Sequence, residues 1–144
     1  MQPTPSSDAA RRWCTVARQY DPRGHRPTPV PVTFLYRRAD PLCVQATFHS
    51  PTNGDVVWEL GRDVLIAGTR APAGSGDVAV WPASAATPNG VVWLRLGPEG
   101  EHALLSLDRA QMSAWLMTTC LLVPPGTEED HLDWTLLDQL LAGR

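Results

Sequence analysis

Apolar and polar residues alternate along much of the chain. Val44, Ala46 and Phe48 are separated by single polar residues, so one face of this segment is apolar and the other is polar. A period of two with one polar face is typical of a strand in an antiparallel sheet that has one side in water. The preceding apolar run, Val32 to Tyr36, ends at a turn that contains Pro41. Because proline suits the second position of a tight turn, the two runs predict a hairpin.

Similar runs recur between clusters of glycine, proline, asparagine and serine, which are the residues that favour turns. The predicted strands are Trp13 to Tyr20, Val32 to Tyr36, Leu42 to His49, Val56 to Leu60, Val78 to Trp81, Val91 to Leu96 and His102 to Leu105. About six or seven short strands at this spacing predict antiparallel sheets that form a sandwich or a barrel-like structure.

The period changes after these strands and predicts one long helix. Its apolar residues lie three or four positions apart, at Leu107, Ala110, Ala114, Met117 and Leu121. Ser106 or Asp108 can cap its start, and Pro124 ends it. A second apolar stripe is formed by Met112, Trp115 and Leu116. Because a helix that is apolar over much of its circumference contacts more than its own sheet, these three residues are predicted to form an oligomer interface.

Two shorter helical segments complete the prediction. Arg62 to Gly68 is expected to be a short helix that Gly68 ends. Thr127 to Asp130 resembles a capping box before a narrow C-terminal stripe of leucines, which are Leu136, Leu137, Leu140 and Leu141. We therefore expect an α+β fold of antiparallel sheets with one short helix, one long helix and a C-terminal amphipathic helix. Residues 1–12 are expected to be a disordered lead, and residues 13–142 to form a single domain.

Composition and charge narrow the functional class. The chain has 144 residues, of which 43% are hydrophobic, and a formal net charge of −3. This length is enough for one domain with a substantial core. Since the chain has no net basic charge, long-range attraction to nucleic acid or to an anionic membrane is not predicted.

The cysteines and the N-terminus indicate a reducing compartment. Cys14, Cys43 and Cys120 are odd in number and far apart, which fits free thiols better than a disulfide framework. The first residues lack the apolar core of a signal peptide, and no run is long enough to span a membrane. A cytoplasmic protein without membrane insertion is expected.

The titratable residues do not form a recognisable catalytic or metal-binding pattern. Ser75 and Ser113 lack the glycine pattern of a nucleophile elbow, and Cys43 lies inside a predicted strand. None of the four histidines has a second histidine or cysteine at metal-binding spacing; they are His25, His49, His102 and His131. The clustered acids lie in turns where carboxylates are normally solvated, namely Glu99, Glu101, Glu128, Glu129 and Asp130. We therefore predict that the chain is not an enzyme and uses no cofactor and no metal.

Three polar positions beside turns remain as candidate partner-binding residues: Arg62, Asp63 and Asp77. Arg62 and Asp63 could form a functional ion pair. Alternatively, Asp63 favours the N-terminus of the short helix while Arg62 lies in solvent. The glycine-rich segment around Asp77 lacks the lysine of a phosphate loop and precedes a strand, so it is interpreted as a structural turn.

Several strings along the chain occur in an order that is specific to one family. DPLCVQATFH, VVWELGRDVL, GSGDVAVWP, GVVWLRL, PEGEHALL and VPPGTEE resemble, in this order, the SsgA-like proteins of spore-forming filamentous bacteria. The resemblance extends from Trp13 to Leu141. The chain departs from the family pattern at Leu42, where members often have an aromatic residue, and in the turn 100–103, which is one residue longer.

The resemblance implies a non-catalytic regulator of sporulation-specific cell division and of septal wall remodelling. It implies recruitment to the septum and contact with the tubulin-like division protein FtsZ, with another SsgA-like protein or with wall-synthesis enzymes. It also implies a homotrimer, or another homo-oligomer, with a fold similar to the whirly-type nucleic-acid binders. A second hypothesis is therefore a protein that binds single-stranded nucleic acid through strand aromatics such as Trp58, Trp81 and Trp93. The acidic balance makes nucleic acid the less favoured partner.

Overall fold

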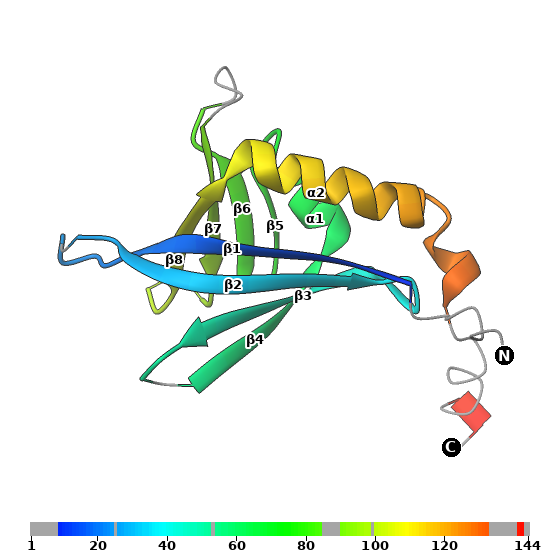
Figure 1. Cartoon of the computed structure of the whole chain (residues 1–144), viewed down its shortest axis with the longest axis horizontal. Coiled ribbons are helices and arrows are strands. Elements are labelled where there is room, and N and C mark those ends of the chain that lie inside the picture. Colours follow the sequence, from blue (N-terminus) through cyan, green and yellow to red (C-terminus); the bar gives the residue numbers. More distant parts are fainter. Residues whose placement is uncertain are drawn as a thin grey trace, which may run out of the picture.

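One antiparallel sheet of eight strands forms the framework of the molecule (Figure 1). The computed structural model describes residues 9–24, 26–52, 54–84, 90–98, 100–132 and 141–142. In chain order the elements are β1 (Ala10–Tyr20), β2 (Thr28–Arg37), β3 (Asp40–Ser50), β4 (Gly54–Gly61), α1 (Arg62–Gly68), β5 (Ala73–Ser75), β6 (Val78–Pro82), β7 (Val91–Leu96), β8 (Ala103–Asp108), α2 (Arg109–Leu122) and the 3₁₀ turn η1 (Glu128–His131).

The strand order in the sheet is β4-β3-β2-β1-β8-β7-β6-β5. Figure 1 shows that the half made of β1 to β4 runs across the half made of β5 to β8, so the sheet curls strongly. The helix α2 lies along the concave side, where it contacts β1, β7 and β8. The short helix α1 links the two ends of the sheet, because it follows β4 and precedes β5. This arrangement leaves β4 and β5 as the edge strands.

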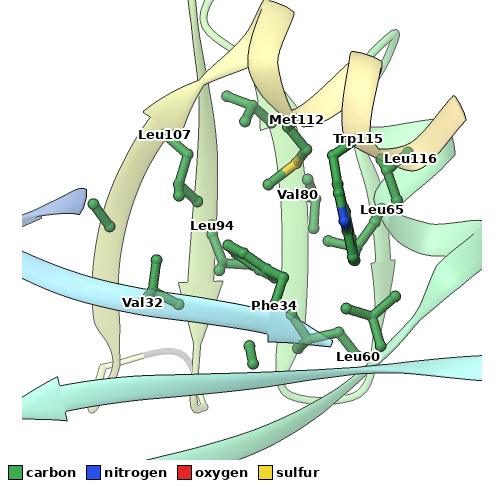
Figure 2. Packing of buried hydrophobic residues seen from close by; sticks show 14 of the residues in the cluster. Val32, Phe34, Leu60, Leu65, Val80, Leu94, Leu107, Met112, Trp115 and Leu116 are labelled. Atoms are coloured by element: carbon green, nitrogen blue, oxygen red, sulfur yellow. The ribbon is translucent and has the colours of Figure 1, made fainter. Parts of the chain in front are cut away.

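Alternating residues of the strands fill the space between the curled sheet and α2. Figure 2 shows Phe34 of β2 pointing toward Met112 and Trp115 of α2, with Leu94 of β7 beside it. The Phe34 ring lies 5.0 Å from the ring of Trp13 and 5.9 Å from that of Trp115. Such aromatic pairs add to the stabilisation that burial of their apolar area provides.

The antiparallel α+β architecture is confirmed, but the number of strands differs from the prediction. The sheet has eight strands because Ala73–Ser75 pairs with Val78–Val80 as β5. Its sequence, AGS, has no strand pattern and was interpreted as part of a turn. The first strand begins at Ala10 rather than at Trp13, since residues 10–12 pair with residues 35–37 of β2. Residues 10–12, which were expected to be disordered, are therefore part of β1, whereas residues 1–8 lie outside the described residues.

The predicted short helix and long helix are found as α1 and α2, with two corrections to the residues that were expected to cap or end helices. Asp108 caps α2 by accepting a hydrogen bond from the Gln111 amide at 2.8 Å. Gly68 does not end α1 through a left-handed conformation; a Cβ at this position would overlap the side chain of Val80. Thr127 does not act as a capping-box residue, because its hydroxyl donates to the carbonyl of Pro124. The predicted C-terminal helix falls mostly on residues 133–140, which lie outside the described residues.

Candidate interaction surface

The side chain of Arg62, at the start of α1, is buried and only 3% exposed. Its Nη1 donates to two carbonyls at the C-terminal end of α2, those of Thr119 at 3.1 Å and Val123 at 2.7 Å. Its Nη2 contacts the Glu128 carboxylate at 2.9 Å. The Thr119 carbonyl also accepts a hydrogen bond from the Val123 amide at 2.9 Å, so the guanidinium is its second donor. At Val123 the guanidinium bonds the carbonyl of the residue that caps the end of the helix.

The aromatic ring of Tyr36 forms the other wall of this cluster. The Arg62 guanidinium lies over that ring, 4.8 Å from its centroid, and the Tyr36 hydroxyl donates to the Pro41 carbonyl at 3.0 Å. Burial raises the pKa of Tyr36 to about 12, and the nearby positive charge of Arg62 partly opposes that rise. The cluster therefore connects α1, the end of α2 and the β2–β3 turn through neutral tyrosine and paired charges.

Arg62 was predicted to be a partner-binding residue beside a turn, but its side chain is buried and pairs with Glu128. Neither sequence alternative, a functional ion pair with Asp63 or an Arg62 in solvent, describes this arrangement. Asp63 is exposed and accepts a hydrogen bond from the Val64 amide at 2.9 Å, which fits the role of stabilising the start of α1. Asp77 is exposed in the two-residue loop between β5 and β6, where Gly76 has a positive φ of 59°. The glycine-rich segment is therefore a hairpin turn, as predicted.

A hollow of about 400 Å³ opens beside the Arg62 cluster. Its walls include Pro41, Leu42, Asp63, Ile66 and Pro125. Leu42 is 50% exposed, although it is a large apolar residue. The buried contacts of Arg62 therefore lie directly beneath a surface recess that has apolar walls and the acidic residue Asp63 at its rim.

The predicted oligomer contact through Met112, Trp115 and Leu116 is corrected by burial. All three side chains lie in the protein's own core, between α2 and the sheet (Figure 2). The exposed apolar residues of α2 are instead Met117, 63% exposed, and Leu121, 78% exposed. From Ala110 to Leu122 the helix contains no charged residue. A helix surface in water usually carries charges, so this face has the character of a contact surface.

The structure brings together one potential ligand group that the sequence did not reveal. Among the described residues, ligand atoms of Asp40, Cys43 and Glu59 lie within 4.8 Å of one another. Burial raises the pKa of the Cys43 thiol, and the neighbouring carboxylates of Asp40 and Glu59 raise it further. Both effects favour the protonated thiol at neutral pH, and exposed acidic groups of this kind are common without a metal ion.

A row of three polar side chains, Asp55, His49 and Thr33, crosses the outer face of the sheet. Asp55 Oδ1 lies 3.1 Å from His49 Nδ1, and His49 Nε2 lies 3.0 Å from the hydroxyl of Thr33. This order resembles the acid, histidine and hydroxyl of a hydrolase. However, β2 is paired on both sides, by β1 and β3. Backbone amides around Thr33 are therefore engaged in the sheet, so they do not supply the donors of an oxyanion hole. The row is best explained as cross-strand stabilisation.

The fold and this surface define a class: a small α+β domain with a curled antiparallel sheet, in which the Arg62 cluster connects elements internally and large apolar residues of α2 and the β2–β3 turn are exposed. Among the described residues, no helix combines the length and apolar content needed to cross a bilayer.

Comparisons with known proteins identify the family. Residues 30–128 match the family described as Streptomyces sporulation and cell division protein, SsgA. The chain therefore belongs to the SsgA family. The sporulation-specific cell division protein SsgB of Streptomyces coelicolor is 45% identical over 115 residues, which cover 79% of this chain and 80% of that protein. The SsgB of Frankia casuarinae is 40% identical over 119 residues, covering 83% and 80% of the two chains.

Solved structures agree with this assignment. A structure from work on SsgB mutations and longitudinal cell division during sporulation of Streptomyces coelicolor has a TM-score of 0.77 and 33% identity, covering 89% of this chain and 99% of the other. The SsgA-like sporulation-specific cell division protein of Thermobifida fusca has a TM-score of 0.80 and 26% identity, covering 97% and 98%. The family resemblance found in the sequence is thus confirmed, and the family is not a known enzyme family.

Proposed function

We propose that this protein is a non-catalytic regulator of sporulation-specific cell division that acts by protein contact at the septum. The observation that carries the proposal is its relationship, over about four fifths of both chains, to proteins named for sporulation-specific division. The structure adds physical support, because its buried polar residues connect elements while apolar residues remain exposed on α2 and near Leu42. Its partners are FtsZ, another SsgA-like protein or an enzyme of wall synthesis.

The exposed face of α2 supports a homo-oligomer, with a homotrimer as the expected form. Met117 and Leu121 lie one helical turn apart on the side of α2 that faces away from the sheet. Covering them with the same face of another copy would remove apolar surface from water without burying a charge. This assignment moves the predicted interface from Met112, Trp115 and Leu116 to the opposite side of the same helix.

Single-stranded nucleic acid is the second candidate, because Trp81 and Trp93 stand opposite each other on β6 and β7. The Trp93 ring, however, already packs edge-on against Tyr20 at 5.0 Å. A ring in such contact has less area for base stacking, and the net charge of −3 provides no general attraction to phosphates. Protein contact is therefore the better-supported mode of action.

The division role is tested in the host. A fluorescent fusion expressed from the native locus should concentrate at division sites during sporulation, and deletion of the gene should disturb the placement or number of septa. Complementation with the wild-type gene is the control. Normal septation in the deletion strain together with diffuse fluorescence would refute the proposal.

A further inference from the structure

The outer edge of β4 is open to solvent. β4 is the last strand on its side of the sheet and pairs only with β3, through residues 54–61 (Figure 1). The side chains of Asp55, Val56, Val57 and Glu59 are all exposed. An edge strand presents backbone amides and carbonyls that have no partner in the sheet, and another extended segment can pair with them.

This edge lacks the features that normally prevent strand addition. Proteins protect edge strands with proline, lysine, bulges or charged side chains that point inward. The sequence of β4, GDVVWELG, contains no proline and no basic residue. Its inward positions are apolar, and its register with β3 is regular from Cys43↔Gly61 to Ser50↔Gly54. The edge can therefore accept a partner strand without distortion.

The two faces of β4 differ in chemistry. Val56 and Trp58 line an apolar groove of about 570 Å³ on the concave side, with Phe48 and Leu105 among its other walls. A volume of this size is typical of small ligand or side-chain pockets. On the opposite face, Asp55 and Glu59 flank Val57, and Asp55 also contacts His49 of β3 at 3.1 Å. A strand added beside β4 would thus place every second side chain toward the groove and the others beside two carboxylates.

The two carboxylates oppose pairing with a second copy of the same strand. In an antiparallel pair of two β4 strands centred on Val57, Asp55 of each copy would stand opposite Glu59 of the other. Like charges in directly opposed positions destabilise a strand pair, whereas a basic residue at the same place stabilises it. Charge complementarity therefore selects a partner of opposite sign.

We propose that the β4 edge binds an extended peptide of a partner protein in which apolar residues alternate with lysine or arginine. Its backbone extends the sheet, its apolar side chains enter the groove beside Val56 and Trp58, and its basic side chains face Asp55 and Glu59. This inference rests on the proposed function, because it describes how a partner is held.

The test uses a blocked seven-residue peptide of alternating lysine and valine, with a glutamate–valine peptide as the charge control. Wild-type protein should bind the lysine peptide, and the preference over the glutamate peptide should be about tenfold or more. The double variant Asp55→Lys, Glu59→Lys should reverse that preference. Asp130→Lys, which changes an exposed carboxylate of η1, should retain the wild-type preference.

Backbone pairing is tested separately from charge. Peptide binding should slow amide hydrogen exchange in Gly54–Gly61, and a lysine–valine peptide N-methylated at alternate amides should bind more weakly, because it cannot complete the hydrogen bonds of a strand pair. Equal binding of the methylated peptide, or an unchanged preference in a folded double variant, would overturn the proposal. If the double variant does not fold, the comparison of methylated and unmethylated peptides on the wild-type protein still tests the proposal.

The outcome is separable from that of the division assay. Septal localisation without peptide binding would refute the β4 proposal alone. Peptide binding with the expected charge reversal, in a protein that is absent from septa, would refute the division role and leave the β4 site in place.

Discussion

Arg62 shows how a single side chain can organise several parts of this fold. Its guanidinium contacts carbonyls and a carboxylate that lie 57 to 66 residues further along the chain. Burying a charge is costly unless hydrogen bonds and an opposite charge compensate for it, and here both are present. The sequence marked Arg62 as noteworthy but placed it at the surface, because partners so distant in the chain leave no local pattern.

Replacing Arg62 by methionine should lower the free energy of unfolding by about 3 kcal/mol, since it removes the opposite charge beside Glu128 and the guanidinium bonds to the Thr119 and Val123 carbonyls. Urea denaturation measures the loss. The exposed Arg70→Met variant serves as a matched control and should stay near wild type. In the Arg62→Met background, Glu128→Gln should cost less than it does alone, because the carboxylate has already lost its partner. If the losses of stability in Arg62→Met and Glu128→Gln simply add in the double variant, the two side chains do not form an ion pair.

Tyr36 should make the protein sensitive to alkaline pH. Its pKa is raised from 10.0 to about 12 in the folded state. The folded protein therefore holds the phenolic proton more tightly than the unfolded chain does. The resulting contribution to the free energy of unfolding is complete below pH 10 and is lost as the pH rises toward 12. Urea titrations at pH 9 and pH 11.5 should show a steeper loss of stability in wild type than in Tyr36→Phe. The variant should already be weaker by about 1 kcal/mol at neutral pH, having lost one hydrogen bond. If wild type and Tyr36→Phe lose the same stability between pH 9 and pH 11.5, Tyr36 is not the group responsible for the alkaline sensitivity.

Among the elements, α2 and α1 show most clearly what the sequence could and could not predict. The period of α2 was evident and Asp108 was one of two candidate caps. Both sides of the helix are apolar, so periodicity alone could not say which one packs inward. The strands with regular alternation were predicted, whereas β5 was not, because its three residues form a strand only by pairing with β6. Gly68 was interpreted as a local signal that ends the helix. The structure gives a different reason for glycine at this position, because any side chain here would overlap Val80 of β6.

Substitution of Gly68 by alanine should therefore destabilise the packing of α1 against β6. The added Cβ would overlap the Val80 Cβ, which a change of rotamer cannot move. We expect a loss of about 3 kcal/mol, in spite of the higher helix propensity of alanine. The control is Ala67→Ser, at an exposed position of the same helix, which should change stability little. A Gly68→Ala protein as stable as wild type would refute the close approach.

The exposed face of α2 makes a prediction about assembly. The double variant Met117→Glu, Leu121→Glu should remain folded, because both side chains lie outside the core, and it should be monomeric. The wild-type protein should have the mass of an oligomer in light scattering at micromolar concentration. Gln111→Glu places a charge on an exposed position of the same helix away from these two residues and should leave the mass unchanged. Monomeric wild-type protein, or an oligomeric double variant, would refute this interface.

Across the whole molecule, the polar clusters with the most internal contacts connect elements of the fold. Arg62 and Tyr36 connect elements, the His49 row supports the sheet, and the charged groups near Cys43 keep its thiol protonated. The absence of a catalytic pattern in the sequence and the family assignment point in the same direction. The proposed contact surfaces, by contrast, rest on the exposure of particular side chains, which depends on the complete fold.

The central claim is that this protein regulates division by binding a protein of the division machinery. Its most direct test is sedimentation of the purified protein with polymerised FtsZ from the same host, compared with binding to short single-stranded DNA at low and high salt. The protein should pellet with FtsZ polymers, stay in the supernatant without them, and bind DNA weakly. Tight, salt-dependent DNA binding without any co-sedimentation would contradict it.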